Sequence, residues 1–135
     1  IKAGWFELVP VIEMPQIYFG SIRSLTAVDL IAGNVAASCW LEGKPVSNFS
    51  FDKLDSMQVE MFHDGKLIEA PYGKNVGGQK DALAWLIVHL SSRGVRIDKG
   101  DLLITGKLGR IHLPAVGRYA VKYGSFGVLN FSFVE

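Results

Sequence analysis

The sequence is poor in cysteine, in net charge and in long apolar runs. Its 135 residues include one cysteine, Cys39, so the chain forms neither an internal disulfide nor a zinc site of several cysteines. Its 14 basic and 13 acidic residues give a net charge of +1, without the basic surplus typical of nucleic-acid-binding proteins. No uncharged apolar run reaches the roughly 18 residues of a membrane-spanning helix. We therefore expect neither a nucleic-acid partner nor a membrane partner, and the lone cysteine favours a reducing, cytoplasmic location.

Familiar catalytic motifs are also missing. The sequence has no Gly-x-Ser-x-Gly elbow, no phosphate-binding P-loop and no His-Glu-x-x-His pair. Its three histidines, His63, His89 and His112, are too far apart in the sequence for metal-ligand spacing, and we expect each to be structural or solvent-facing. Cys39 falls in a predicted buried strand, where a thiol is inert. In the absence of these motifs, no residue is assigned to catalysis from a motif.

The apolar content of the chain indicates a folded protein. Hydrophobic residues make up 49% and aromatic residues 11% of the sequence, whereas disordered chains are poor in both. A chain of 135 residues has the size of one ordinary domain. We find no internal repeat and no low-complexity linker, and we interpret residues 1–135 as a single domain.

Local patterns predict many strands, one long helix and one short helix. Apolar residues recur at helical spacing over Gln79–Arg93, which predicts the long helix. Thr26–Ala32 is predicted as the short helix, with Gly33 as its stop. Asp64 and Gly65 form an Asp-Gly pair between two alternating segments, which predicts the turn of a β-hairpin.

The predicted strands are joined mainly by loops. The expected strands are Trp5–Met14, Val35–Leu41, Met57–Phe62, Lys66–Ala70, Leu102–Thr105 and two within Arg118–Val134, and the expected loops are 15–24, 47–55 and 73–78. Because the elements do not alternate as repeated βαβ units, we expect an α+β fold. Its sheet is expected to be mixed, mostly antiparallel and of β-roll or barrel-like form.

Glu13 is an acidic residue in an otherwise apolar stretch. Burying a carboxylate costs several kcal/mol unless it is paired or bound to a metal. The alternation of side chains along a strand also allows Glu13 to face solvent, and spacing alone favours that interpretation. Both interpretations remain open on the residues themselves.

Thr105, Gly106 and Lys107 form a second candidate site. A carboxylate ligand needs N–H and O–H donors and a positive charge, and these three residues supply a hydroxyl, a backbone amide and an ammonium group. A strand end followed by a solvated lysine explains the same residues equally well. On the sequence alone, substrate binding by this segment is one of two alternatives.

Three segments together resemble a known enzyme family. They are Gly77–Leu86, with the sequence GGQKDALAWL, then Arg93 and Gly94, then Lys99–Gly106, with the sequence KGDLLITG. This series resembles the C-terminal half of 2-keto-4-pentenoate hydratases, which belong with 4-oxalocrotonate decarboxylases in the fumarylacetoacetate hydrolase superfamily. Val9–Pro15, with the sequence VPVIEMP, is similar to the Ile-Glu-Leu-Pro segment of these enzymes.

The resemblance implies a fold, a cofactor and a substrate class. The implied fold is the β-roll of the C-terminal part of the superfamily, and the implied cofactor is Mg²⁺ or Mn²⁺. The substrate would be a small-molecule 2-oxo acid of the 2-hydroxy-dienoate type, hydrated or decarboxylated by a lyase. Glu13 stands at the position of the third metal-binding carboxylate of the family. Thr105, Gly106 and Lys107 stand where many relatives have a substrate-binding Thr-Gly-Ser.

Three functions follow from these observations. In relatives, a Glu-x-Glu or Glu-x-Asp pair upstream of Glu13 supplies the other metal-binding carboxylates, so we expect the chain to be a C-terminal fragment or truncated form of a lyase. A second possibility is a pseudoenzyme or binding module that keeps the fold and the 2-oxo-acid pocket. A third is a structural domain that forms homo-oligomers through exposed strands such as Phe131–Val134.

Overall fold

The computed structural model describes residues 1–17, 24–74 and 77–135. Its helices are α1 (Ala27–Ala32), α2 (Phe51–Ser56) and α3 (Gln79–Ser92), its strands are β1 (Val11–Met14), β2 (Cys39–Glu42), β3 (Val59–His63), β4 (Lys66–Glu69), β5 (Gly117–Tyr123) and β6 (Val128–Phe133), and single 3₁₀ turns span Ala3–Trp5, Asn34–Ala36 and Gly124–Phe126. The loops predicted over 15–24 and 73–78 include residues 18–23 and 75–76, which lie outside the described residues.

Two antiparallel sheets form the β-structure. The larger sheet has the strand order β4-β3-β5-β6, and the smaller one pairs β1 with β2. β3 and β4 form the predicted hairpin, in which Asp64 and Gly65 adopt the positive φ angles, 47° and 79°, that such tight turns need. β5 and β6 form the predicted C-terminal pair. The mostly antiparallel arrangement expected from the sequence is confirmed.

Both predicted helices are present, together with a second short helix. Thr26 caps α1, because its side chain accepts a hydrogen bond from the backbone N–H of Asp29 while the Asp29 carboxylate accepts one from the backbone N–H of Thr26. α1 ends at Gly33, as predicted. α2 falls in the segment 47–55 that was expected to be a loop. Ser50 caps it by accepting from the backbone N–H of Lys53.

The two N-terminal strands are shorter than predicted. Within Trp5–Met14 only β1 is a regular strand. Trp5 ends a 3₁₀ turn, Leu8 makes an isolated bridge with Val46, and Pro10 lacks the N–H that a continuous ladder needs. The strand predicted over Val35–Leu41 begins at Cys39, because Asn34, Val35 and Ala36 have φ angles of 51°, 55° and 62°, which no β-strand adopts. Cys39 is exposed, so the prediction of a buried thiol was wrong.

The hydrophobic core lies on one face of the four-stranded sheet. Val121, in the middle of β5, is 1% exposed and is the most deeply buried large side chain described. It lies in one cluster with Leu54 of α2, Val59, Tyr123 and Phe126. The Tyr123 hydroxyl donates a 2.7 Å hydrogen bond to the carbonyl of residue 11, and burial raises the pKa of Tyr123. This bond connects the core of the larger sheet to β1.

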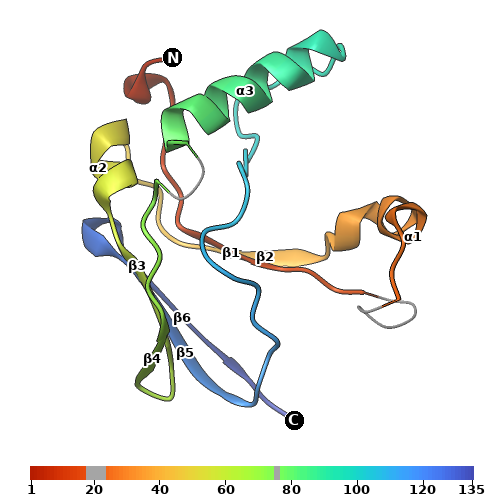
Figure 1. Ribbon diagram of the computed structural model, residues 1–135. Helices are drawn as coiled ribbons and strands as arrows, with labels where there is room; N and C mark the ends of the chain where they lie inside the picture. Colours follow the sequence, from red (N-terminus) through yellow and green to blue (C-terminus); the bar gives the residue numbers. More distant parts are fainter. Residues whose placement is uncertain (18–23, 75–76) are drawn as a thin grey trace.

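β1 and β2 extend away from the four-stranded sheet as a two-stranded arm. Figure 1 shows α1 at the far end of this arm and α3 along the top of the view, above the arm. None of the residues of α1 is buried. After α3 the chain runs back toward β5 as a long irregular segment, also visible in Figure 1. Among the described residues, no helix has the length and apolarity needed to cross a membrane.

Candidate functional site

Glu13 lies on β1, where it points to solvent. Antiparallel pairing places it opposite Trp40 of β2, and its side chain is exposed. Its neighbour Ile12 is partly buried and packs against the core. Strand alternation therefore sends Ile12 inward and Glu13 outward, as the spacing of the sequence favoured.

The described residues do not by themselves form a metal centre. Within residues 1–17, 24–74 and 77–135, no group of three histidine, cysteine, aspartate or glutamate side chains is placed to hold an ion. Mg²⁺ requires near-octahedral oxygen coordination and usually takes one or two protein carboxylates. Glu13 offers an accessible carboxylate, but it belongs to no group of three such side chains among the described residues.

Thr105, Gly106 and Lys107 lie together in the irregular segment between α3 and β5. We call these three residues the Thr-Gly-Lys loop; all three are exposed. The strand predicted over Leu102–Thr105 is not formed, which corrects that expectation. The segment stays irregular because it pairs with no strand among the described residues, and Gly100 and Gly106 on either side of it have φ angles of 102° and 123°.

Two polar contacts hold the Thr-Gly-Lys loop in place. The Thr105 hydroxyl donates to the side-chain oxygen of Gln79 at 3.4 Å, near the limit for a hydrogen bond. The Lys107 ammonium group donates to the carbonyl oxygen of Gly109, two residues further on. An ammonium group has three donors, so Lys107 keeps capacity for a carboxylate ligand.

Gln79 fixes the first side of the loop from the start of α3. Its backbone N–H donates to a carboxylate oxygen of Asp55 at 2.8 Å, and its side-chain amide donates to the carbonyl of Gly73 at 2.6 Å. The hydrogen bond from the Gln79 side-chain amide to Gly73 also orients the side-chain oxygen of Gln79, which accepts from the Thr105 hydroxyl. No sequence pattern indicates this role, because Asp55 lies 24 residues away along the chain.

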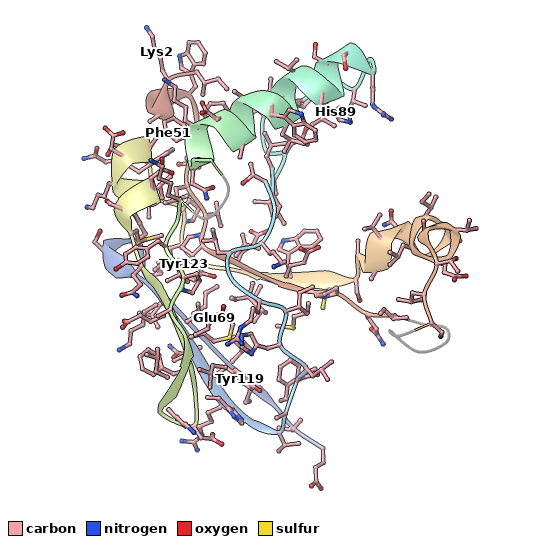
Figure 2. The ribbon with its side chains drawn as sticks, in the orientation of Figure 1. Lys2, Phe51, Glu69, His89, Tyr119 and Tyr123 are labelled. Carbon is pink, nitrogen blue, oxygen red and sulfur yellow. The ribbon has the colours of Figure 1, made fainter. Side chains whose placement is uncertain are left out.

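Glu69, at the end of β4, contacts the other side of the loop region. One carboxylate oxygen accepts from the backbone N–H of Arg110 at 3.0 Å and lies 3.6 Å from the Arg110 side-chain Nε. The other carboxylate oxygen contacts the His112 ring nitrogen Nε2. The Glu69 side chain is only 14% exposed, and Figure 2 shows it within the body of the molecule. His112 is therefore structural, as expected, but its partner Glu69 was not foreseen.

The charge state of Glu69 reflects these partners. Burial acts to raise the pKa of Glu69, because it disfavours the charged form. Hydrogen bonds from the His112 ring and the Arg110 N–H, together with the charges of both side chains, outweigh burial and leave the pKa below its ordinary value. Glu69 is thus held as a carboxylate at neutral pH.

A shallow groove lies elsewhere, on the face of the larger sheet opposite the core. Its volume is about 590 Å³, and Arg118, Lys122 and Phe62 are among its lining residues. The Lys122 ammonium group lies 4.5 Å from the centre of the Phe62 ring. Neither Glu13 nor the Thr-Gly-Lys loop lines this groove, so the sequence-predicted site residues do not meet there.

Comparison with known proteins supports the family resemblance. No family model matches the chain. The chain is 27% identical over 110 residues to a 2-keto-4-pentenoate hydratase of Burkholderia vietnamiensis, and the match covers 79% of this chain and 42% of that protein. A second 2-keto-4-pentenoate hydratase, from Paraburkholderia phymatum, matches with the same identity and coverage.

A solved structure shares the fold. The 4-oxalocrotonate decarboxylase from Pseudomonas putida G7, complexed with magnesium and adipate, aligns with a TM-score of 0.78 and 20% identity over 95% of this chain and 49% of its own. The chain is a distant relative of the 2-keto-4-pentenoate hydratases. The α+β fold expected from the resemblance is confirmed, and the chain spans less than half the length of the relatives that it matches.

Proposed function

We propose that this chain is part of a metal-dependent lyase that acts on 2-oxo acids, by hydration or decarboxylation. The observation that carries the proposal is the similarity to 2-keto-4-pentenoate hydratases over 110 residues. The magnesium and adipate held by the structural relative agree with a divalent metal and a carboxylate ligand. The relatives are about twice as long, so the proposed activity belongs to a protein of their length.

In this proposal, the Thr-Gly-Lys loop holds the substrate carboxylate. The Gly106 N–H, the Lys107 ammonium group and the Thr105 hydroxyl are the donors that a carboxylate requires. Thr105 must first release Gln79, which costs little because that hydrogen bond is 3.4 Å long. The exposure of all three residues leaves them accessible to a ligand.

Glu13 is proposed as one oxygen ligand of the divalent metal. Its exposed carboxylate on β1 is accessible to an ion, and the described residues do not complete a group of three acidic, histidine or cysteine ligands with it. We assign no reaction step to the metal in this chain, because these residues do not complete its site.

Isothermal titration with oxalate, a stable dicarboxylate that resembles a 2-oxo acid, tests both assignments. We expect binding that strengthens when Mg²⁺ is added. Lys107→Ser should weaken oxalate binding, whereas Lys66→Ser, at an exposed position of the β-hairpin, should not. Glu13→Gln should remove the effect of Mg²⁺, whereas Glu42→Gln on the neighbouring strand should keep it. Identical isotherms for Lys107→Ser and the unaltered chain would exclude the loop from binding.

A second function is favoured by Lys107 itself. A lysine supplies a positive charge to a carboxylate without any metal. A binding module that keeps the fold would use this charge alone. The same titration separates the two functions, since the module predicts oxalate affinity that is equal with and without Mg²⁺.

A further inference from the structure

One peptide group links Glu69 to the Thr-Gly-Lys loop. The Glu69 carboxylate accepts from the N–H of Arg110, and the Lys107 ammonium group donates to the carbonyl of Gly109. That carbonyl and that N–H belong to the same planar peptide unit, and their bonds point in opposite directions. A contact that fixes the Arg110 N–H therefore also fixes the Gly109 carbonyl oxygen, which accepts the hydrogen bond from Lys107.

Two further features place this peptide group against Glu69. His112 contacts the second carboxylate oxygen, so Glu69 also holds the chain two residues beyond Arg110. The backbone of Gly109 approaches so closely that a Cβ atom there would lie 2.5 Å from Glu69 Oε1 and 3.1 Å from Pro71. The two oxygens of a single carboxylate thus hold a segment that has no helix or strand of its own.

We propose that Glu69 is a positioning residue that fixes the Lys107 ammonium group through the Gly109–Arg110 peptide. The negative charge of the carboxylate strengthens the hydrogen bond from the N–H, and hydrogen bonds in series polarise one another. Glu69 thus fixes the loop from the Lys107 side, whereas the 3.4 Å bond to Gln79 holds the Thr105 side only weakly. The proposal rests on the proposed function only where it concerns ligand binding.

The first test measures the Gly109–Arg110 peptide directly. In ¹⁵N NMR spectra, Glu69→Gln should speed the hydrogen exchange of the Arg110 N–H and change the Lys107 side-chain signal. Asp64→Asn is the matched control, because the Asp64 carboxylate accepts from the N–H of Arg118 at 2.8 Å in another part of the chain. An unchanged Arg110 exchange rate and an unchanged Lys107 signal in Glu69→Gln would overturn the proposal, whether or not the chain binds oxalate.

The second test is a double-mutant cycle on oxalate affinity. Glu69→Gln should lower the affinity about tenfold in the unaltered chain, the loss expected from one charge-assisted hydrogen bond. The same substitution should change it by less than about twofold in the Lys107→Ser background, since contacting residues are non-additive. Equal losses in both backgrounds would show a general structural effect and overturn the proposal.

A His112 variant and the NMR measurement cover the cases in which Glu69→Gln unfolds or oxalate does not bind. His112→Gln leaves the Arg110 contact in place and should cause a smaller change than Glu69→Gln, so this variant still tests the attachment if Glu69→Gln unfolds. A larger loss in His112→Gln than in Glu69→Gln would contradict the proposal. If the unaltered chain binds no oxalate, the proposed function fails, while the NMR measurement still decides the role of Glu69.

Discussion

Truncation of Val121 tests the packing that fixes the arm bearing Glu13 against the larger sheet. Val121 is 1% exposed and lies in the cluster that includes Tyr123, whose hydroxyl bonds to β1. Val121→Ala removes two methyl groups, which are worth about 1.6 kcal/mol at roughly 0.8 kcal/mol for each buried carbon. The cavity left behind adds to this loss, so we expect the free energy of unfolding to fall by about 2–3 kcal/mol.

Urea denaturation followed by circular dichroism measures this loss. The urea concentration at the midpoint of unfolding should fall. The slope of the unfolding free energy against urea should stay the same, because unfolding exposes the same amount of surface. Val128→Ala on β6 is the matched control, because that valine is 51% exposed. It should change the free energy by less than about 0.5 kcal/mol. Equal losses for the two variants would refute the placement of the core.

Four further predictions follow from individual residues. Tyr123→Phe should lower the free energy of unfolding by about 1 kcal/mol in urea denaturation, because it leaves a β1 carbonyl without its donor. The pKa of Glu69 is lower in the folded than in the unfolded chain. Its contribution to the free energy of unfolding should therefore be complete above its ordinary pKa and disappear as the pH falls through the folded pKa. Glu69→Gln should accordingly flatten the acid side of the profile of stability against pH. Gly109→Ala should destabilise the chain more than Gly100→Ala in thermal melts, because both have positive φ but only Gly109 lacks room for a Cβ. Cys39 is exposed, so a thiol reagent should label the folded chain without denaturant; labelling only after unfolding would contradict its position.

Local signals in the sequence were sufficient for the hairpin and for the boundaries of α1 and α3. The Asp-Gly turn at Asp64 and Gly65, the Thr26 cap and the Gly33 stop act through bonds between near neighbours, so sequence patterns reveal them. The predicted helix over Gln79–Arg93 also agrees with α3, which spans Gln79–Ser92.

Other features depend on contacts between distant parts of the chain. α2 was missed because it has only six residues, and its apolar face consists of Phe51 and Leu54, too few for a helical period to be recognised. The strand predicted over Leu102–Thr105 had the right residues, but its backbone pairs with no other strand. Residue type alone does not provide a neighbouring strand.

The candidate site was predictable only in part. Residue chemistry singled out Glu13 and the Thr-Gly-Lys loop but left alternatives open, the family resemblance suggested their roles, and those roles remain proposals. The Glu69 contacts with Arg110 and His112 span 41 and 43 residues of sequence, and no short motif encodes such a pairing. Such bonds emerge only when the fold places β4 beside the irregular segment that precedes β5.

The most direct test of the account is an NMR titration of the ¹⁵N-labelled chain with oxalate in the presence of Mg²⁺. The account predicts saturable shifts that are largest at the amides of Gly106 and Lys107. Shifts confined to the groove around Arg118 and Lys122, or the absence of any saturable shift, would contradict it.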